Sequence, residues 1–69
     1  MFDVRKFDAQ LALRNISRKE LAEYLGISEA TMYRKIKSGG RFSRDEINKM
    51  IDLLEIEEPM TIFFTNKLA

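Results

Sequence analysis

Apolar residues recur every three or four positions along most of the chain, and no stretch alternates regularly between apolar and polar residues. This spacing is typical of amphipathic helices rather than strands. Four segments also share a helix-start pattern, in which an apolar residue precedes a capping residue and another apolar residue follows four positions after the cap. The four caps are Asp3, Ser17, Ser28 and Ser43. An all-α fold without a sheet is therefore predicted.

The same spacing predicts where the first, second and fourth helices run. The first extends from Asp3 to about Arg14, and Asn15 suits a left-handed residue just beyond its end. Glu20 and Glu46 each lie three residues after a cap and complete two capping boxes. The residues expected to face the core from these three helices are Val4, Phe7, Leu11, Leu21, Ala22, Leu25, Ile47, Met50, Ile51 and Leu54.

A fifth, short helix is predicted from Met60 to about Asn66, because Pro59 suits the first turn of a helix. The helix carries more apolar surface than one face needs. Three consecutive residues are candidates both for the core and for a contact with a second copy of the chain: Ile62, Phe63 and Phe64.

The helix that follows Ser28 has two different faces. With about 100° between successive residues, Met32 and Ile36 point together toward the core. The outward stripe combines a small, an aromatic and two cationic side chains: Ala30, Tyr33, Arg34 and Lys37. A short turn at Gly26 separates this helix from the one before it.

Composition excludes several classes of protein. The 69 residues make one domain, residues 1–69, and contain no Cys and no His, which removes thiolate chemistry, disulfides, and the commonest metal ligand and general base. We therefore expect no enzyme, no cofactor, no metal and no small-molecule ligand. No apolar run approaches the 20 or so residues that span a bilayer, and the N-terminus lacks the centre of a signal peptide. We expect a cytoplasmic protein that does not contact a membrane.

The net charge of +1 hides an uneven distribution. Residues 1–44 hold ten Lys and Arg against five Asp and Glu, whereas residues 45–69 hold two against six, so the two parts carry +5 and −4. Such asymmetry is typical of a fold with one basic face and one acidic flank. On charge alone, chance clustering on a solvated surface explains the pattern equally well.

The outward stripe also fits the chemistry of the DNA major groove. Arg binds guanine through two hydrogen bonds, and Ala contacts a thymine methyl group. Arg18 and Lys19 open the second helix, where the backbone N–H groups favour a phosphate. The alternative interpretation of the outward stripe is that its charged side chains only keep the helix surface soluble. Tyr33 is equally suited to contact a base or to cover the edge of the core. The loop after Lys37 adds Arg41 and Arg44, which are candidates for a second group of phosphate contacts.

The central segment resembles the helix-turn-helix of the Cro and lambda-repressor-like (Xre) family, and is close to small phage repressors of Gram-positive bacteria. The residues that carry the resemblance are Ser17-Arg18-x-x-Leu21-Ala22, Leu25-Gly26-Ile27-Ser28, Thr31-Met32-Tyr33-Arg34 and Gly39, with weaker support from Glu46-Ile47 and Ile62-Phe63-Phe64. The resemblance implies a compact five-helix domain whose third helix reads DNA. It implies base contacts by Ser28, Glu29, Ala30, Tyr33 and Arg34. The phosphate candidates are Arg18, Lys19, Thr31, Lys37, Arg41 and Arg44.

Two positions depart from the family pattern. Lys35 stands where the family usually has an apolar or aromatic residue, and Ile36 takes over the packing, so a small rotation of this helix is expected. Glu29 stands where many relatives are neutral or basic. It suits either a cytosine amino group or the positive end of the helix.

The functional prediction is a sequence-specific transcriptional regulator that binds a pseudo-palindromic double-stranded DNA operator as a weak homodimer. Two half-sites are expected because one reading helix contacts too few base pairs to compete with a genome. The alternative is a module that uses the same fold to bind a protein, as an antitoxin or antirepressor target does. Its working surface would be the acidic segment of residues 52–58 together with the fifth helix.

Overall fold

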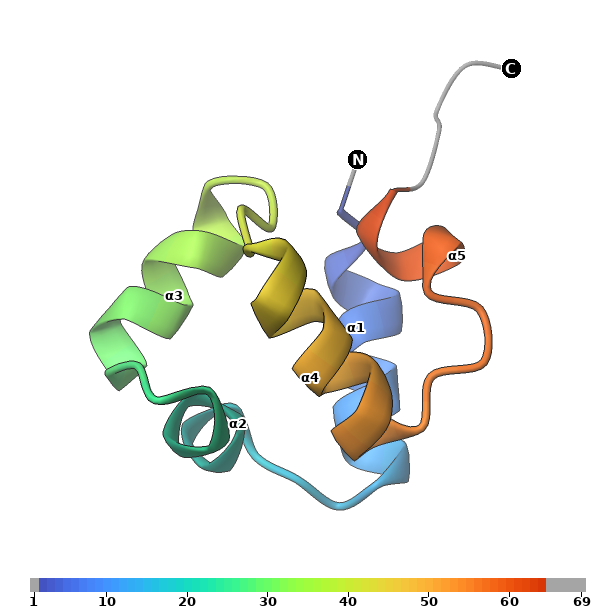
Figure 1. The fold of residues 1–69 in the computed structure, drawn as a ribbon, viewed down its shortest axis with the longest axis horizontal. Helices are drawn as coiled ribbons and strands as arrows, with labels where there is room; N and C mark the ends of the chain where they lie inside the picture. Colours follow the sequence, from blue (N-terminus) through green and yellow to red (C-terminus); the bar gives the residue numbers. More distant parts are fainter. Residues whose placement is uncertain (1, 65–69) are drawn as a thin grey trace.

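A computed structural model describes residues 2–64, and the only regular secondary structure in that range is helical (Figure 1). The helices are α1 (Val4–Leu13), α2 (Arg18–Leu25), α3 (Glu29–Lys37), α4 (Arg44–Leu54) and α5 (Met60–Phe63). The all-α, five-helix prediction is confirmed. None of these helices is long and apolar enough to cross a membrane.

The helices begin where the capping pattern places them. The side chains of Asp3, Ser17, Ser28 and Ser43 each accept a hydrogen bond from the backbone N–H three residues later. Both predicted capping boxes form, since Glu20 and Glu46 accept in return from the backbone N–H of their caps. A cap of this kind contributes about 1 kcal/mol to helix stability. Local sequence alone therefore defines the start of four helices.

Three of the helix ends use residues in the left-handed conformation. Asn15 has φ +57° after α1, as predicted, and Gly26 has φ +76° in the turn between α2 and α3. Glu55 has φ +51° after α4, an end that the acidic run of the sequence does not reveal. The last carbonyl of α4 is nevertheless satisfied: Leu54 accepts from Gln10 Nε2 at 2.7 Å and from Arg14 Nε at 2.8 Å. These two bonds tie α1 to the end of α4.

The core draws on all five helices. Its largest fully buried side chains are Phe7, Leu21, Met32, Met50 and Leu54. Four aromatic rings pack at the end of the core near α5, with neighbouring centroids 5.1–6.5 Å apart: Phe2, Phe7, Phe42 and Phe63. The predicted core residues of α2 and α3 are all buried, which confirms the orientation of the helix-turn-helix.

Some predictions about the core need correction. Val4 was expected to face inward but is 37% exposed, because Phe2 closes the core from outside α1 and contacts both Phe7 and Phe63. Ile47 and Ile51 are only partly buried. α5 ends at Phe63; the remainder of its predicted span, from Thr65 to Asn66, lies outside the described residues.

Candidate nucleic-acid interface

α3 exposes the face that periodicity selects. Met32 is 1% exposed and Ile36 is 6% exposed, so both anchor the helix in the core. The opposite face is open to solvent and carries Glu29, Ala30, Tyr33, Arg34 and Lys37. Figure 1 shows α3 at one end of the molecule, between α2 and the loop of residues 38–43. This arrangement leaves the outward stripe accessible to a large ligand.

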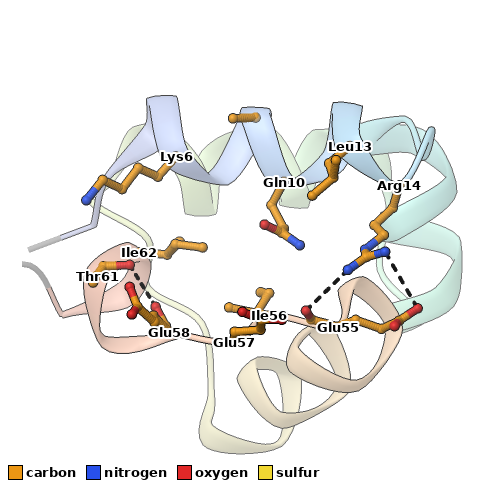
Figure 2. A pocket seen from close by; sticks show the side chains of 11 residues that line it. Lys6, Gln10, Leu13, Arg14, Glu55, Ile56, Glu57, Glu58, Thr61 and Ile62 are labelled. Carbon is orange, nitrogen blue, oxygen red and sulfur yellow. Dashed lines mark hydrogen bonds and ion pairs between the residues drawn. The ribbon is translucent and has the colours of Figure 1, made fainter.

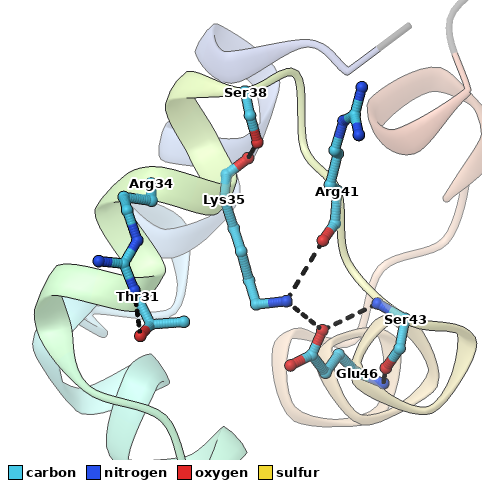
Figure 3. A network of polar contacts seen from close by, with 7 residues as sticks. All are labelled: Thr31, Arg34, Lys35, Ser38, Arg41, Ser43 and Glu46. Carbon is cyan, nitrogen blue, oxygen red and sulfur yellow. Dashed lines mark hydrogen bonds and ion pairs between the residues drawn. The ribbon is translucent and has the colours of Figure 1, made fainter.

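Arg34 is held in place by the start of its own helix. Its Nη2 donates to Thr31 Oγ1 at 3.1 Å (Figure 3). Thr31 Oγ1 also accepts from the Ser28 hydroxyl at 3.0 Å. Ser28 Oγ in turn accepts the Thr31 backbone N–H. Ser28 thus caps α3, as predicted, whereas the orientation of Arg34 by Thr31 was not predicted from the sequence. Arg34 uses one N–H here, and four remain for a ligand.

Tyr33 lies at the surface rather than over the edge of the core. It is 55% exposed, and Lys37 Nζ lies 5.7 Å from the centre of its ring. That separation is within the range of a cation–π contact. Of the two orientations left open by the sequence, the structure has the outward one.

Arg18 is paired with a carboxylate that the sequence did not single out. Its Nε donates to Asp8 Oδ1 at 3.0 Å and its Nη2 donates to Oδ2 at 2.7 Å. This side-on geometry uses two of the five N–H groups and leaves the others for a phosphate. Asp8 belongs to α1, ten residues away, so the pair depends on how α1 and α2 cross. Lys19 beside it is exposed.

Lys35 fastens the loop of residues 38–43 to α3. Its Nζ lies 3.3 Å from the Arg41 carbonyl and 3.4 Å from Glu46 Oε1 (Figure 3). The same atom lies 6.0 Å from the centre of the Phe42 ring. Its backbone carbonyl also accepts the N–H groups of Gly40 and Arg41. The backbone bonds would form with any residue here, but an apolar side chain would lack the contacts of Nζ with the Arg41 carbonyl and the Glu46 carboxylate.

The loop itself is closely packed on its inner side. Gly40 has φ +74°, and a Cβ there would run into the ring of Phe2. The loop and the start of α4 present Arg41 and Arg44 as exposed cations. The predicted phosphate candidates therefore lie on different elements: two on α2 (Arg18 and Lys19), two on α3 itself (Thr31 and Lys37), one on this loop (Arg41) and one at the start of α4 (Arg44).

The predicted dimer residues separate into core and surface. Ile62 is 5% and Phe63 is 6% exposed, so both belong to the core of one chain and are unsuited to contact a second copy; Phe64 is 51% exposed. Phe64 borders an apolar groove of about 460 Å³ between α4 and α5. The groove is lined by Phe42, Arg44, Ile47, Asn48, Ile51, Pro59, Met60 and Phe64. Met60, 64% exposed, adds a second projecting apolar side chain.

A second groove of about 460 Å³ runs between α1 and the segment that joins α4 to α5 (Figure 2). One wall has the exposed Leu13, and the other has Glu55, Glu57 and Glu58. Arg14 crosses it and lies 3.8 Å from the Glu55 carboxylate. Among residues 2–64, no group of acidic side chains is arranged to hold a metal ion.

Helices α2 and α3 are both capped and are joined by a tight turn at Gly26, and they share one core with the other three helices. This arrangement defines a small helix-turn-helix protein. Comparison with protein families agrees: the model of the antitoxin Xre-like helix-turn-helix domain matches residues 4–55. The chain belongs to this Xre-like helix-turn-helix family. The matched range includes α1 to α4, and α5 lies beyond it. Comparisons with curated proteins and with solved structures gave no significant match.

Proposed function

We propose that the protein is a sequence-specific DNA-binding transcriptional regulator that inserts α3 into the major groove. The observation that carries the proposal is the division of α3, in an Xre-like helix-turn-helix, into a buried edge and an exposed cationic stripe. An α-helix fits the width of the major groove, where base pairs differ in their donor and acceptor patterns. A regulator of this kind works in the bacterial cytoplasm, at the nucleoid, by blocking RNA polymerase at its operator.

Arg34 is the main base reader in this proposal. Its contact with Thr31 restricts the side chain before DNA arrives, which lowers the entropy lost on binding. A bidentate contact from Arg to guanine discriminates against other bases by about 1–3 kcal/mol. Ala30, Tyr33 and Glu29 complete the reading surface. Ser28 contributes through its cap and through Thr31.

Phosphate contacts then orient α3 without reading sequence. Arg18 and Lys19 approach the backbone on one side of the groove, and Arg41 and Arg44 approach it on the other. Each neutralised phosphate releases counterions, so the affinity for any duplex falls as salt rises. Arg18→Ala should weaken all sequences alike and make this salt dependence less steep.

The operator is pseudo-palindromic in this proposal, because the protein binds as a weak homodimer. A two-fold contact needs a surface that fits itself. The groove between α4 and α5 offers a hollow bordered by Ile47 and Ile51 and two projecting side chains, Met60 and Phe64. Half-sites are then expected about one helical turn apart.

The decisive experiment is selection of bound sequences from a pool of random duplexes. The expected result is an enriched site with two-fold symmetry, whose half-site spacing reports the geometry of the dimer. If no sequence is enriched and no duplex is retarded even at low salt, the DNA-binding proposal is overturned.

The second candidate function is binding of a protein partner, as the antitoxin in the description of the matched family implies. The observation that favours it is the groove beside α1, where three glutamates face the exposed Leu13. The segment that carries these glutamates lies at the opposite end of the molecule from α3 (Figure 1). A stable complex in a pull-down, together with no retardation of DNA, would favour this function over the first. Neither function involves catalysis or a cofactor.

A further inference from the structure

A small hollow lies beside α3 on the side proposed to face DNA. It measures about 360 Å³ and lies between the start of α2 and the first half of α3. It is lined by Arg18, Glu29, Ala30, Met32 and Tyr33. None of the roles assigned above explains why a hollow exists between the phosphate contact and the base readers.

The lining of the hollow is mostly apolar, from the buried Met32, the ring of Tyr33 and the methyl group of Ala30. Of its two charged residues, Arg18 is paired with Asp8 and Glu29 is exposed to solvent. An apolar group is therefore a good match for the hollow, because it leaves water without losing a hydrogen bond.

We propose that this hollow receives the 5-methyl group of a pyrimidine base in the major groove. The inference rests on the proposed DNA-binding function and names one base that α3 selects. The C5-methyl group of thymine is the apolar group that standard base pairs present in this groove. A 5-methylcytosine presents the same group at the same ring position, next to an amino group that Glu29 can accept from.

The test replaces single atoms of the DNA rather than of the protein. In the selected operator, each thymine is changed in turn to deoxyuridine, which removes only the methyl group, and binding is measured by fluorescence anisotropy. Burial of one methyl group predicts about fourfold weaker binding at one thymine in each half-site and no change at the others. Changing both symmetric thymines should weaken binding about sixteenfold. In a parallel series, each cytosine is changed in turn to 5-methylcytosine. If binding becomes about fourfold tighter at one cytosine, and no change of thymine to deoxyuridine alters the affinity, the hollow receives the methyl group of 5-methylcytosine instead of that of thymine.

A protein variant then links the effect to the hollow. Ala30→Val fills the space and should bring the thymine-to-uracil affinity ratio from about four to about one. Ala12→Val makes the same change at an exposed position of α1, outside the proposed interface, and should keep the ratio at four. Circular dichroism checks that both variants are folded.

Three outcomes overturn the proposal, and they can be told apart. If the protein binds a defined operator but neither substitution series changes its affinity, the hollow does not take a methyl group and the DNA-binding function stands. If no duplex is enriched or retarded, both the hollow and the DNA-binding function are rejected. An affinity ratio that survives Ala30→Val places the methyl contact elsewhere on α3.

Discussion

α3 and α5 lie toward opposite ends of a molecule whose longest axis is 36 Å (Figure 1). Each is held by two buried apolar residues, Met32 and Ile36 in α3, and Ile62 and Phe63 in α5. Their outer surfaces differ. α3 spans nine residues from a side-chain cap and exposes a cationic stripe. α5 spans four residues, has no side-chain cap, and is bordered by exposed apolar side chains.

The difference shows how one small core supports two kinds of surface. A charged helix face is stable in water by itself and is available to a highly charged ligand such as DNA. Exposed Met and Phe side chains beside an apolar groove are typical of a surface that another protein covers. The two ends of the chain are therefore suited to different partners, and substitutions at each end should affect different measurements.

The largest expected effect is a difference in stability between substitutions of two neighbouring residues, Phe63 and Phe64. Phe63→Ala should lower the free energy of unfolding by about 3–5 kcal/mol, because it leaves a cavity among the packed aromatic rings. That is a large part of the 5–15 kcal/mol typical of a whole domain. Phe64→Ala, the matched control, should change monomer stability by less than about 1 kcal/mol. Urea denaturation at low protein concentration measures both, and equal losses would contradict the division of α5 into core and surface.

The next effect concerns the outer face of α3. Arg34→Ala should leave stability within about 0.5 kcal/mol of the parent, because the side chain is exposed. It should weaken operator binding by about 5–150-fold for each half-site, the equivalent of one lost bidentate base contact per subunit. Anisotropy titrations with operator and with scrambled DNA measure the two affinities.

Lys37→Ala provides the comparison for Arg34 on the same helix. As a phosphate contact, Lys37 should affect operator and scrambled DNA alike. An Arg34→Ala variant whose ratio of the two affinities is unchanged would remove Arg34 from the base-reading surface and would make both cations simple electrostatic contacts.

The third effect tests the apolar surface beside α5. Phe64→Ala should weaken dimerisation about tenfold, as truncation of an aromatic anchor does. Tyr24→Ala is a close control, since Tyr24 on α2 is 49% exposed and Phe64 is 51% exposed, and it should leave dimerisation unchanged. Sedimentation equilibrium gives both constants. A dimer that loses equal affinity in the two variants would place the contact outside the groove between α4 and α5.

Features that depend on residues close in the chain were predictable from sequence. Each cap acts within three residues, so Ser17, Ser28 and Ser43 identify helix starts without knowledge of the fold. The faces of α3 follow from helical periodicity once Met32 is set toward the core. The candidate reading surface therefore emerged from the sequence with its residues in the correct orientation.

Features that depend on how helices cross were not predictable. The pair of Asp8 and Arg18 joins α1 to α2, and the bonds from Arg14 to the end of α4 span forty residues. The orientation of α5 was not predictable for a different reason. Three consecutive apolar residues cover more than half of the circumference of a helix, so periodicity cannot say which of them points outward. Burial of Ile62 and Phe63 decides this, and it moves the proposed dimer contact to Phe64, Met60 and the side of α4.

The smallest expected effect concerns how the C-terminal end of α3 is held; α5 is instead tied to the start of α1, where the Asp3 N–H donates to the Ile62 carbonyl at 2.7 Å. Lys35 and Glu46 have largely covered side chains, 26% and 15% exposed, and their charged atoms lie 3.4 Å apart. A double-mutant cycle with Lys35→Met and Glu46→Gln should give a coupling energy of about 0.5–1 kcal/mol in urea denaturation. Glutamine keeps an oxygen for the Ser43 N–H, so the capping box is retained and the cycle isolates the charge pair.

The coupling energy between Lys35 and Glu46 should decrease at high salt, because this pair is only partly shielded from solvent. A coupling near zero would mean that packing of Ile36 alone fixes the end of α3, and that Lys35 is held by the Arg41 carbonyl without contributing through Glu46.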